Sequence, residues 1–291
     1  MSWTPAKWAG RDGVRVYYEV HGSGPAVSFV HGSGGHHAAW WQQVAALRDD
    51  YTVITLDLRG FGCTRWDGEH DARSFPGDIS AVLEAVAGAG GPARSVLVGQ
   101  SIGAAAALRA GLSRPGRVAG LVLAHSLGGI RHEELAGLVR ADRAAAERLP
   151  VLDRLLTPGF RERRPDLAFL FRQMGTFNTA TMADLRNLNS DGPWLDDVAA
   201  APFPVMLLAG ERDAVLSPAT VRRAGELLPG ARVEIVPGAP HSMYWETPDL
   251  FNDALRKFLA EVYRPEERHE TGLSARLNAM DPGFHGVTER S

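Results

Sequence analysis

The chain is poor in cysteine, in net charge and in long apolar runs. Its 291 residues include a single cysteine, Cys63, which excludes an internal disulfide and fits a reducing compartment. A net charge of −3 provides no field that would attract nucleic acid or an anionic membrane. No apolar run approaches the roughly 20 residues that span a bilayer, and the N-terminal residues lack the pattern of a secretory signal. These absences predict a cytoplasmic protein with neither nucleic-acid nor membrane partners.

What the chain does contain is an alternation of short apolar runs with helix-forming segments. The apolar fraction of 45% and the charged fraction of 22% are ordinary for a globular protein. Strands are expected at 14–20, 26–30, 51–56, 95–99, 118–124, 205–209 and 231–236, with helices between most of them. Such alternation predicts an α/β fold with a mostly parallel sheet that helices cover on both faces. The first run, 14–20, is expected as an antiparallel edge strand.

The alternation stops after about residue 127 and resumes near residue 200. The intervening 128–199 contains helical patterns at 131–149 and 167–188 and no strand pattern, so we interpret it as a helical insertion. Met174 and Phe177 are expected to point inward. The predicted organisation is therefore a core in two parts, 1–127 and 200–263, the insertion, and a polar tail, 264–291. The tail is expected to be flexible or to order against a partner chain, for example in a homodimer.

The strand at 95–99 leads into the sequence Gly99-Gln100-Ser101-Ile102-Gly103 and then into an alanine-rich helix. Gly-x-Ser-x-Gly between a strand and a helix is typical of a nucleophile elbow, in which the serine adopts a strained backbone and its neighbours lack a Cβ. Because the chain has 32 glycines, the motif alone also fits a chance occurrence. The strand-to-helix context favours Ser101 as a nucleophile.

A serine nucleophile needs a base and an acid that orients the base. Functional residues of parallel sheets follow the carboxyl ends of strands. His241 follows the last predicted strand and Asp213 follows the one before it, so the order is Ser101, Asp213, His241. Asp57 also follows a strand, but its Asp-x-Arg-Gly-x-Gly setting favours a turn-forming role.

Four other histidines lie near predicted strand ends or the glycine loop. His31 precedes a glycine loop, where hydrogen bonding to loop backbone is expected. His125 ends a strand next to the elbow strand and is expected either in the substrate site or in the core. His36 and His37 are adjacent, but no accompanying ligand spacing favours a metal. The sequence therefore predicts no metal and no cofactor.

The glycine loop at 32–35 is expected to supply part of an oxyanion hole. Stabilising a tetrahedral oxyanion takes preorganised N–H donors. Ile102, at the helix start, offers one, and Ser33 offers the second, with Gly34 as the alternative. No lysine follows as in a P-loop, and the Gly-x-Gly-x-x-Gly spacing is absent, which disfavours nucleotide binding.

Five motifs in this order resemble the α/β-hydrolase superfamily over about residues 14–263. They are His31-Gly32-Ser33-Gly34-Gly35, Asp57-Leu58-Arg59-Gly60-Phe61-Gly62, Gly99-Gln100-Ser101-Ile102-Gly103, Gly210-Glu211-Arg212-Asp213 and Pro240-His241-Ser242. The resemblance implies a helical cap over the carboxyl ends of the strands, with Ser101 as nucleophile, Asp213 as acid and His241 as base. Epoxide hydrolases and haloalkane dehalogenases of this superfamily carry aspartate at the elbow, where this chain has serine.

Within the superfamily the chain is most similar to small cap-bearing esterases, enol-lactonases and carbon–carbon bond hydrolases. We expect a serine hydrolase of a carboxylic ester or lactone of a small, largely apolar metabolite. The alternatives are a carbon–carbon (meta-cleavage-type) hydrolase, a thioesterase and, outside enzymes, a small-molecule receptor that reuses the fold. Gly34, Gln100, His125 and Met174 are the expected substrate contacts. An apolar cap lining is expected from Leu167, Phe169, Leu170, Phe171, Met174 and Phe177.

Overall fold

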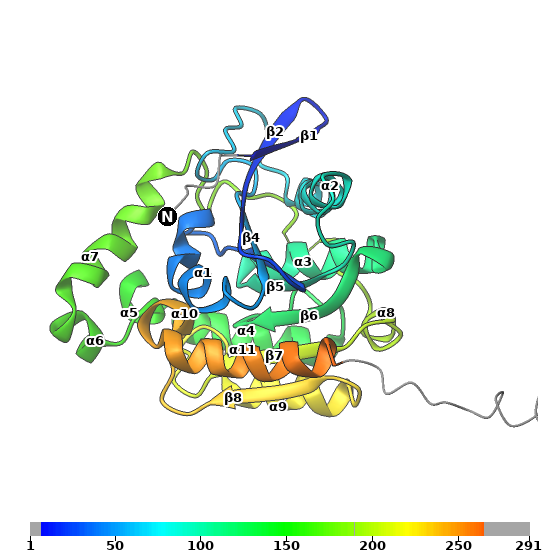
Figure 1. The fold of residues 1–291 in the computed structure, drawn as a ribbon. Helices are drawn as coiled ribbons and strands as arrows, with labels where there is room; N and C mark the ends of the chain where they lie inside the picture. Colours follow the sequence, from blue (N-terminus) through cyan, green and yellow to red (C-terminus); the bar gives the residue numbers. More distant parts are fainter. Residues whose placement is uncertain (1–6, 189, 265–291) are drawn as a thin grey trace, which may run out of the picture.

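The computed structural model describes residues 7–188 and 190–264, and its centre is a mostly parallel eight-stranded sheet (Figure 1). The strand order is β1-β2-β4-β3-β5-β6-β7-β8. The β1–β2 and β2–β4 pairs are antiparallel, and every other pair is parallel. The strands are β1 (Lys7–Arg11), β2 (Val14–His21), β3 (Ala26–Val30), β4 (Thr52–Leu56), β5 (Ser95–Gln100), β6 (Val118–Ala124), β7 (Val205–Gly210) and β8 (Arg232–Val236). The expected α/β class and mostly parallel sheet are confirmed.

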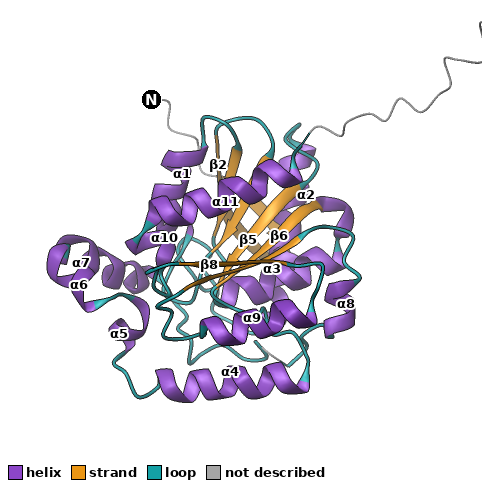
Figure 2. Cartoon of the chain, turned by 90° about the horizontal axis from the view of Figure 1, so that it is seen from below, coloured by secondary structure: helices purple, strands orange, loops and turns teal. Residues whose placement is uncertain are grey.

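Helices cover both faces of this sheet (Figure 2). The α-helices are α1 (Trp41–Leu47), α2 (Phe75–Gly88), α3 (Ile102–Ser113), α4 (Glu133–Ala146), α5 (Val151–Leu155), α6 (Pro158–Arg163), α7 (Pro165–Met174), α8 (Leu195–Ala199), α9 (Pro218–Leu227), α10 (Met243–Glu246) and α11 (Pro248–Val262). Short 3-10 turns are η1 (His37–Trp40), η2 (Ala72–Ser74), η3 (Pro115–Arg117) and η4 (Gly175–Phe177).

Alternate side chains of each central strand enter two separate cores. In β5, Leu97 belongs to the core beneath α2, α3 and α9, whereas Val96 and Val98 belong to the core beneath α1 and α11. All six β5 residues are buried. A strand buried on both faces reads as a continuous apolar run, which is why the central strands were recognisable in the sequence.

The N-terminal edge of the sheet differs from the expectation. The run 14–20 was predicted as the edge strand, but β2 has a neighbour on both sides because β1 takes the edge position. β1 and β2 are joined through Asp12 and Gly13, both at positive φ (48° and 77°), as a two-residue hairpin turn of the primed type requires. The sequence of β1, KWAGR, has few apolar residues and does not alternate as a strand pattern would, so no strand was predicted there.

The helices of the inserted segment do not form a single group. Figure 1 shows α5, α6 and α7 together at the left, with α8 on the opposite side. The helix expected at 167–188 is wrong after Phe177, because the chain there bonds to core loops instead of to itself. The N–H groups of Thr179 and Ala180 both donate to Gly60 O, and Asp71 and Arg186 form a bridge.

Several side chains expected to line this segment's inner side are exposed. Phe177 is 58% exposed, and Phe169 and Leu170 are 61% and 42% exposed. Met174 is buried, as expected. Phe171 packs edge-on against Trp245 of α10. The apolar composition of α7 therefore does not translate into a wholly inward apolar face.

None of the helices in the described ranges is long and apolar enough to cross a membrane. The tail expected at 264–291, with its suggested role in a homodimer, lies outside the described residues apart from Arg264.

Candidate active site

The turn between β5 and α3 forces Ser101 into a strained conformation. Its φ is 54° and its ψ is −115°, values that cost a non-glycine residue about 1–3 kcal/mol. The flanking glycines are required by close packing. A Cβ on Gly99 would lie 2.4 Å from Gly103 O, and a Cβ on Gly103 would lie 2.3 Å from Val30 O. The strand and helix thus approach closely enough to project Ser101 beyond the end of the sheet.

Four consecutive strands each deliver one polar residue to the same edge of the sheet. Ser101 directly follows β5 and His125 directly follows β6, and the strand ends that precede them, Gln100 and Ala124, are in register. Asp213 follows β7 and His241 follows β8. The carboxyl ends of parallel strands are the usual position of functional groups in such sheets.

Asp213 and His241 form a buried hydrogen-bonded pair. His241 Nδ1 lies 2.9 Å from Asp213 Oδ1 and 3.0 Å from Oδ2, and the Asp213 side chain is fully buried. Oδ1 also accepts the N–H groups of Val215 and Leu216 at 2.8 and 3.0 Å. Burial opposes ionisation, but the neighbouring His241 and His125 outweigh it and hold the pKa of Asp213 well below its usual value. Asp213 is therefore an anion that faces His241 Nδ1 and fixes the orientation of the His241 ring.

The glycine loop lies against the elbow. A Cβ on Gly32 would lie 2.1 Å from Gln100 Oε1 and 3.4 Å from Ser101 Cβ, so a larger residue there would displace the Gln100 side chain. Gln100 Nε2 lies 3.4 Å from His241 Nε2. Gly35 N donates to Gly32 O at 3.0 Å, and this turn leaves the N–H groups of Ser33 and Gly34 outside its own hydrogen bond.

Ile102, the other expected oxyanion donor, is the first residue of α3. The first N–H groups of a helix have no acceptor within the helix, and they lie at its positive end. The Ile102 side chain is buried in the core beneath α3, so the backbone of this residue is held firmly.

His31 and Asp57, which were expected to have structural roles, hold the glycine loop and its neighbours in place. His31 Nδ1 donates to Gly32 O at 2.8 Å, and its Nε2 accepts the Leu58 N–H at 3.1 Å, which confirms the expected backbone role. Asp57 accepts the N–H groups of Cys63 at 2.7 Å and of His37 at 2.5 Å. Its turn-forming role is confirmed, and it also binds the His37 ring at 2.9 Å.

Met174 and His125, two of the expected substrate contacts, lie in different surroundings. Met174 ends α7 beside Gly175, where an added Cβ would be 3.6 Å from Gly34 O, so α7 ends against the glycine loop. The His125 side chain has no exposed surface, and its Nδ1 lies 2.9 Å from Asp213 Oδ2. His125 therefore contacts Asp213, a role that was not expected from the sequence. The strand order would have indicated it, because β6 lies directly beside β7.

Asn178 joins the inserted segment to the glycine loop and to the loop after β4. The sequence did not indicate this role. Asn178 Oδ1 accepts the Gly62 N–H at 2.9 Å, and its Nδ2 donates to Gly35 O at 3.3 Å. The residue stands in a stretch that the sequence predicts as helix, so no signal marked it.

Two groups in the described part of the chain have the residue types of metal ligands. They are His36, His37 and Asp57, and His125, Asp213 and His241, each with ligand atoms within 4.8 Å of one another. Hydrogen bonds already use the carboxylate oxygens of both groups. The carboxylate oxygens of both groups therefore already have donors within the protein.

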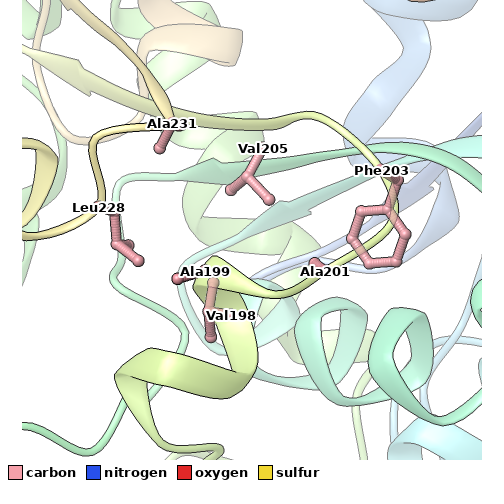
Figure 3. Close-up of a pocket in the computed structure, with 8 residues that line it drawn as sticks. Val198, Ala199, Ala201, Phe203, Val205, Leu228 and Ala231 are labelled. Carbon is pink, nitrogen blue, oxygen red and sulfur yellow. The ribbon is translucent and has the colours of Figure 1, made fainter.

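A small cavity between mainly apolar residue types lies elsewhere, at the amino end of β7 (Figure 3). Its volume is about 160 Å³, and Val198, Phe203, Val205 and Leu228 are among its lining residues. Val205 begins β7, whereas Asp213 follows the other end of that strand. The cavity therefore does not belong to the candidate site.

The sequence of this chain is similar to those of several known hydrolases. A pimeloyl-[acyl-carrier protein] methyl ester esterase of Vibrio atlanticus is 26% identical over 261 residues, 84% of this chain and 97% of that protein. A 2-(acetamidomethylene)succinate hydrolase of Mesorhizobium japonicum is 26% identical over 254 residues, 82% of this chain and 89% of that protein.

A similar solved structure is that of a thermophilic esterase from Thermogutta terrifontis. It has a TM-score of 0.74 and 23% identity, and the match covers 90% of this chain and 99% of the esterase. The family model described as "Alpha/beta hydrolase family" matches residues 29–254. The chain therefore belongs to the α/β hydrolase family.

Proposed function

We propose that the protein is a serine hydrolase that cleaves a carboxylic ester or lactone of a small, largely apolar metabolite. The observation that supports this most directly is the strained Ser101 at the end of β5, with the hydrogen-bonded pair Asp213–His241 after β7 and β8. His241 Nε2 takes the Ser101 hydroxyl proton, and Ser101 Oγ attacks the carbonyl carbon. Asp213 keeps Nδ1–H of His241 oriented and stabilises the ring when it becomes protonated.

The tetrahedral oxyanion is bound by the N–H groups of Ile102 and Ser33. Both are backbone donors whose positions are set by packing and by loop hydrogen bonds, so they need no reorganisation during the reaction. A preorganised donor of this kind lowers a barrier by about 3–4 kcal/mol. The protonated His241 then returns its proton to the leaving group, and a water molecule activated by His241 releases the acid.

The proposed substrate class rests on the surroundings of Ser101 and on the relatives. Because the end of α7 packs against the glycine loop, we expect Met174 and Gly34 to contact the substrate. Gln100 lies beside His241 Nε2. A methyl ester esterase and an esterase are among the similar proteins. The two esterases favour an ester or lactone as the substrate class.

The first test is intact-protein mass after exposure to a fluorophosphonate, on the wild-type protein and on Ser101→Ala. The proposal predicts one phosphonyl adduct that is lost in the variant. The urea midpoint of Ser101→Ala should match or exceed that of the wild type, because alanine removes no packing at this half-buried position. An unlabelled wild-type protein would contradict the proposal and favour a receptor that only binds its ligand.

The second test is a substrate panel measured on the same two proteins. It comprises p-nitrophenyl esters of increasing acyl length, unsubstituted and acylated lactones, an acyl thioester and a vinylogous 1,5-diketone. Ester or lactone turnover that disappears with Ser101→Ala supports the proposed class. Serine-dependent turnover confined to the thioester or the diketone would overturn it in favour of that alternative.

A further inference from the structure

A second histidine is bound to the same carboxylate as His241. Asp213 Oδ1 accepts two backbone N–H groups as well as the His241 ring, whereas Oδ2 receives its second donor from His125, at 2.9 Å. Without His125, Oδ2 would keep only the contact that it shares with His241, at 3.0 Å. The plane of the carboxylate is thus fixed on one side by the backbone and on the other by His125.

The backbone at His125, like that at Ser101, has a positive φ. Its φ is +58°, which is uncommon for residues other than glycine and is adopted most often by asparagine, aspartate and histidine. The His125 N–H donates to Leu208 O of β7 at 2.7 Å, so the ring is aimed by the neighbouring strand toward the loop that carries Asp213.

The protonation state of His125 follows from its contacts. Because Asp213 accepts from Nδ1, the proton is on Nδ1, and Nε2 is buried without a hydrogen-bond partner among the described residues. A second proton at Nε2 would be buried with no acceptor, so His125 remains a neutral donor. The titratable groups that face it are Asp213, from the loop after β7, and His241, from the loop after β8.

We propose that His125 is a positioning residue, which donates Nδ1–H to Asp213 Oδ2 and so keeps the carboxylate oriented and its charge shared between two imidazoles. This inference rests on the proposed function, in which Asp213 orients His241. A carboxylate shared with a neutral donor stabilises a protonated His241 less than an unshared one does. Loss of the donor should therefore lower kcat through disorder of Asp213 and shift the acid limb of the kcat/KM profile to higher pH.

The test compares His125→Asn with His125→Gly. Both residues tolerate the positive φ, but only asparagine retains an N–H at nearly the position of Nδ1. With the ester found in the substrate panel, His125→Asn should keep kcat within about three-fold of the wild type. His125→Gly should lose at least about ten-fold in kcat with little change in KM, and its acid limb should rise by at least about half a pH unit. Equal loss in both variants, or no loss in His125→Gly, would overturn the inference.

Two further measurements keep the test decisive. If His125→Gly does not fold, the downfield proton spectrum decides: among the resonances of hydrogen-bonded imidazole N–H groups, one is expected to disappear in His125→Asn. A spectrum in which no such resonance is lost would overturn the inference. Fluorophosphonate labelling separates the two proposals, because wild-type labelling that is equally fast in His125→Gly contradicts the role of His125 alone. Absent wild-type labelling contradicts the proposed function itself.

Discussion

Single atoms decide several positions around the candidate site. At Gly103, an added Cβ would meet Val30 O at 2.3 Å and His31 O at 2.6 Å, both of them backbone atoms that cannot turn aside. At Gly32 the obstacle is the Gln100 side chain, which lies against His241. The two glycines thus serve different purposes: Gly103 allows α3 to pack on β3, and Gly32 leaves room for a polar contact.

Gly103→Ala is therefore expected to lower the free energy of unfolding by about 2 kcal/mol or more, because strand and helix must move apart. The matched control is Gly88→Ala at the end of α2, where an added Cβ would meet nothing within 4 Å. It should be neutral or stabilising by up to about 1 kcal/mol through helix propensity. Urea unfolding of both variants measures the difference. Equal stability of the two would show that the backbone around Gly103 yields easily.

Among the elements, those with a strong local pattern were predictable and those that depend on distant partners were not. The buried strands β5 and β6 are continuous apolar runs in the sequence, and Ser217-Pro218 predicted the start of α9. β1 has no apolar pattern, because an edge strand buries little. The stretch after Phe177 has helix-like composition, but its N–H groups find acceptors in a loop more than 100 residues earlier.

The same distinction applies to the site. Ser101, Asp213 and His241 could be predicted as a triad because each directly follows a strand or a glycine turn in the sequence. The contact of His125 with Asp213 joins residues 88 positions apart, and that of Asn178 with Gly62 joins residues 116 apart. Such contacts require the strand order and the path of the inserted segment, neither of which local pattern contains.

Asn178 provides a test of the link between the inserted segment and the glycine loop. Asn178→Ala removes the hydrogen bonds to Gly62 N and Gly35 O. We expect faster amide hydrogen exchange in a peptide spanning residues 32–37, with a loss of unfolding free energy of only about 1 kcal/mol. Thr176→Ala is the matched control, since the Thr176 hydroxyl bonds only to the nearby Gln173 O. Unchanged exchange in Asn178→Ala would mean that His31 and Asp57 hold the loop unaided.

For the molecule as a whole, buried histidines make stability depend on pH. Burial lowers the pKa of His31 and of His125, and it lowers the pKa of His36 to about 4 from an ordinary value of 6.5. His37 behaves oppositely: burial lowers its pKa, but the hydrogen bond to Asp57 together with the charges of Asp57 and Glu19 outweighs burial and raises it. Three rings thus resist protonation in the folded state and one favours it.

The expected result is a loss of stability between pH 6.5 and about 4. Over this range the unfolded chain binds protons that folded His31, His36 and His125 do not, so unfolding becomes easier as the pH falls. The stability that His37 contributes is fully present below pH 6.5 and does not reverse the trend. Urea midpoints at pH 7.5, 6 and 5 measure the slope.

His36→Asn serves as the comparison for this slope. The asparagine oxygen can replace Nδ1 as acceptor of the Ala38 N–H, so the start of η1 remains capped, but the residue no longer titrates. The pH dependence should become shallower in this variant. An unchanged slope would show that His36 does not contribute to the acid sensitivity.

The positive φ at His125 also limits how this position can vary during evolution. Histidine codons are one nucleotide substitution away from those of asparagine and of aspartate, the two side-chain-bearing residues that best accept this backbone. Asparagine would keep a donor on Asp213, whereas aspartate would place a second negative charge against it. Of the two residues that fit this backbone and lie one nucleotide substitution away, only asparagine keeps a hydrogen-bond donor for Asp213. Natural variants at this position should therefore favour asparagine over aspartate.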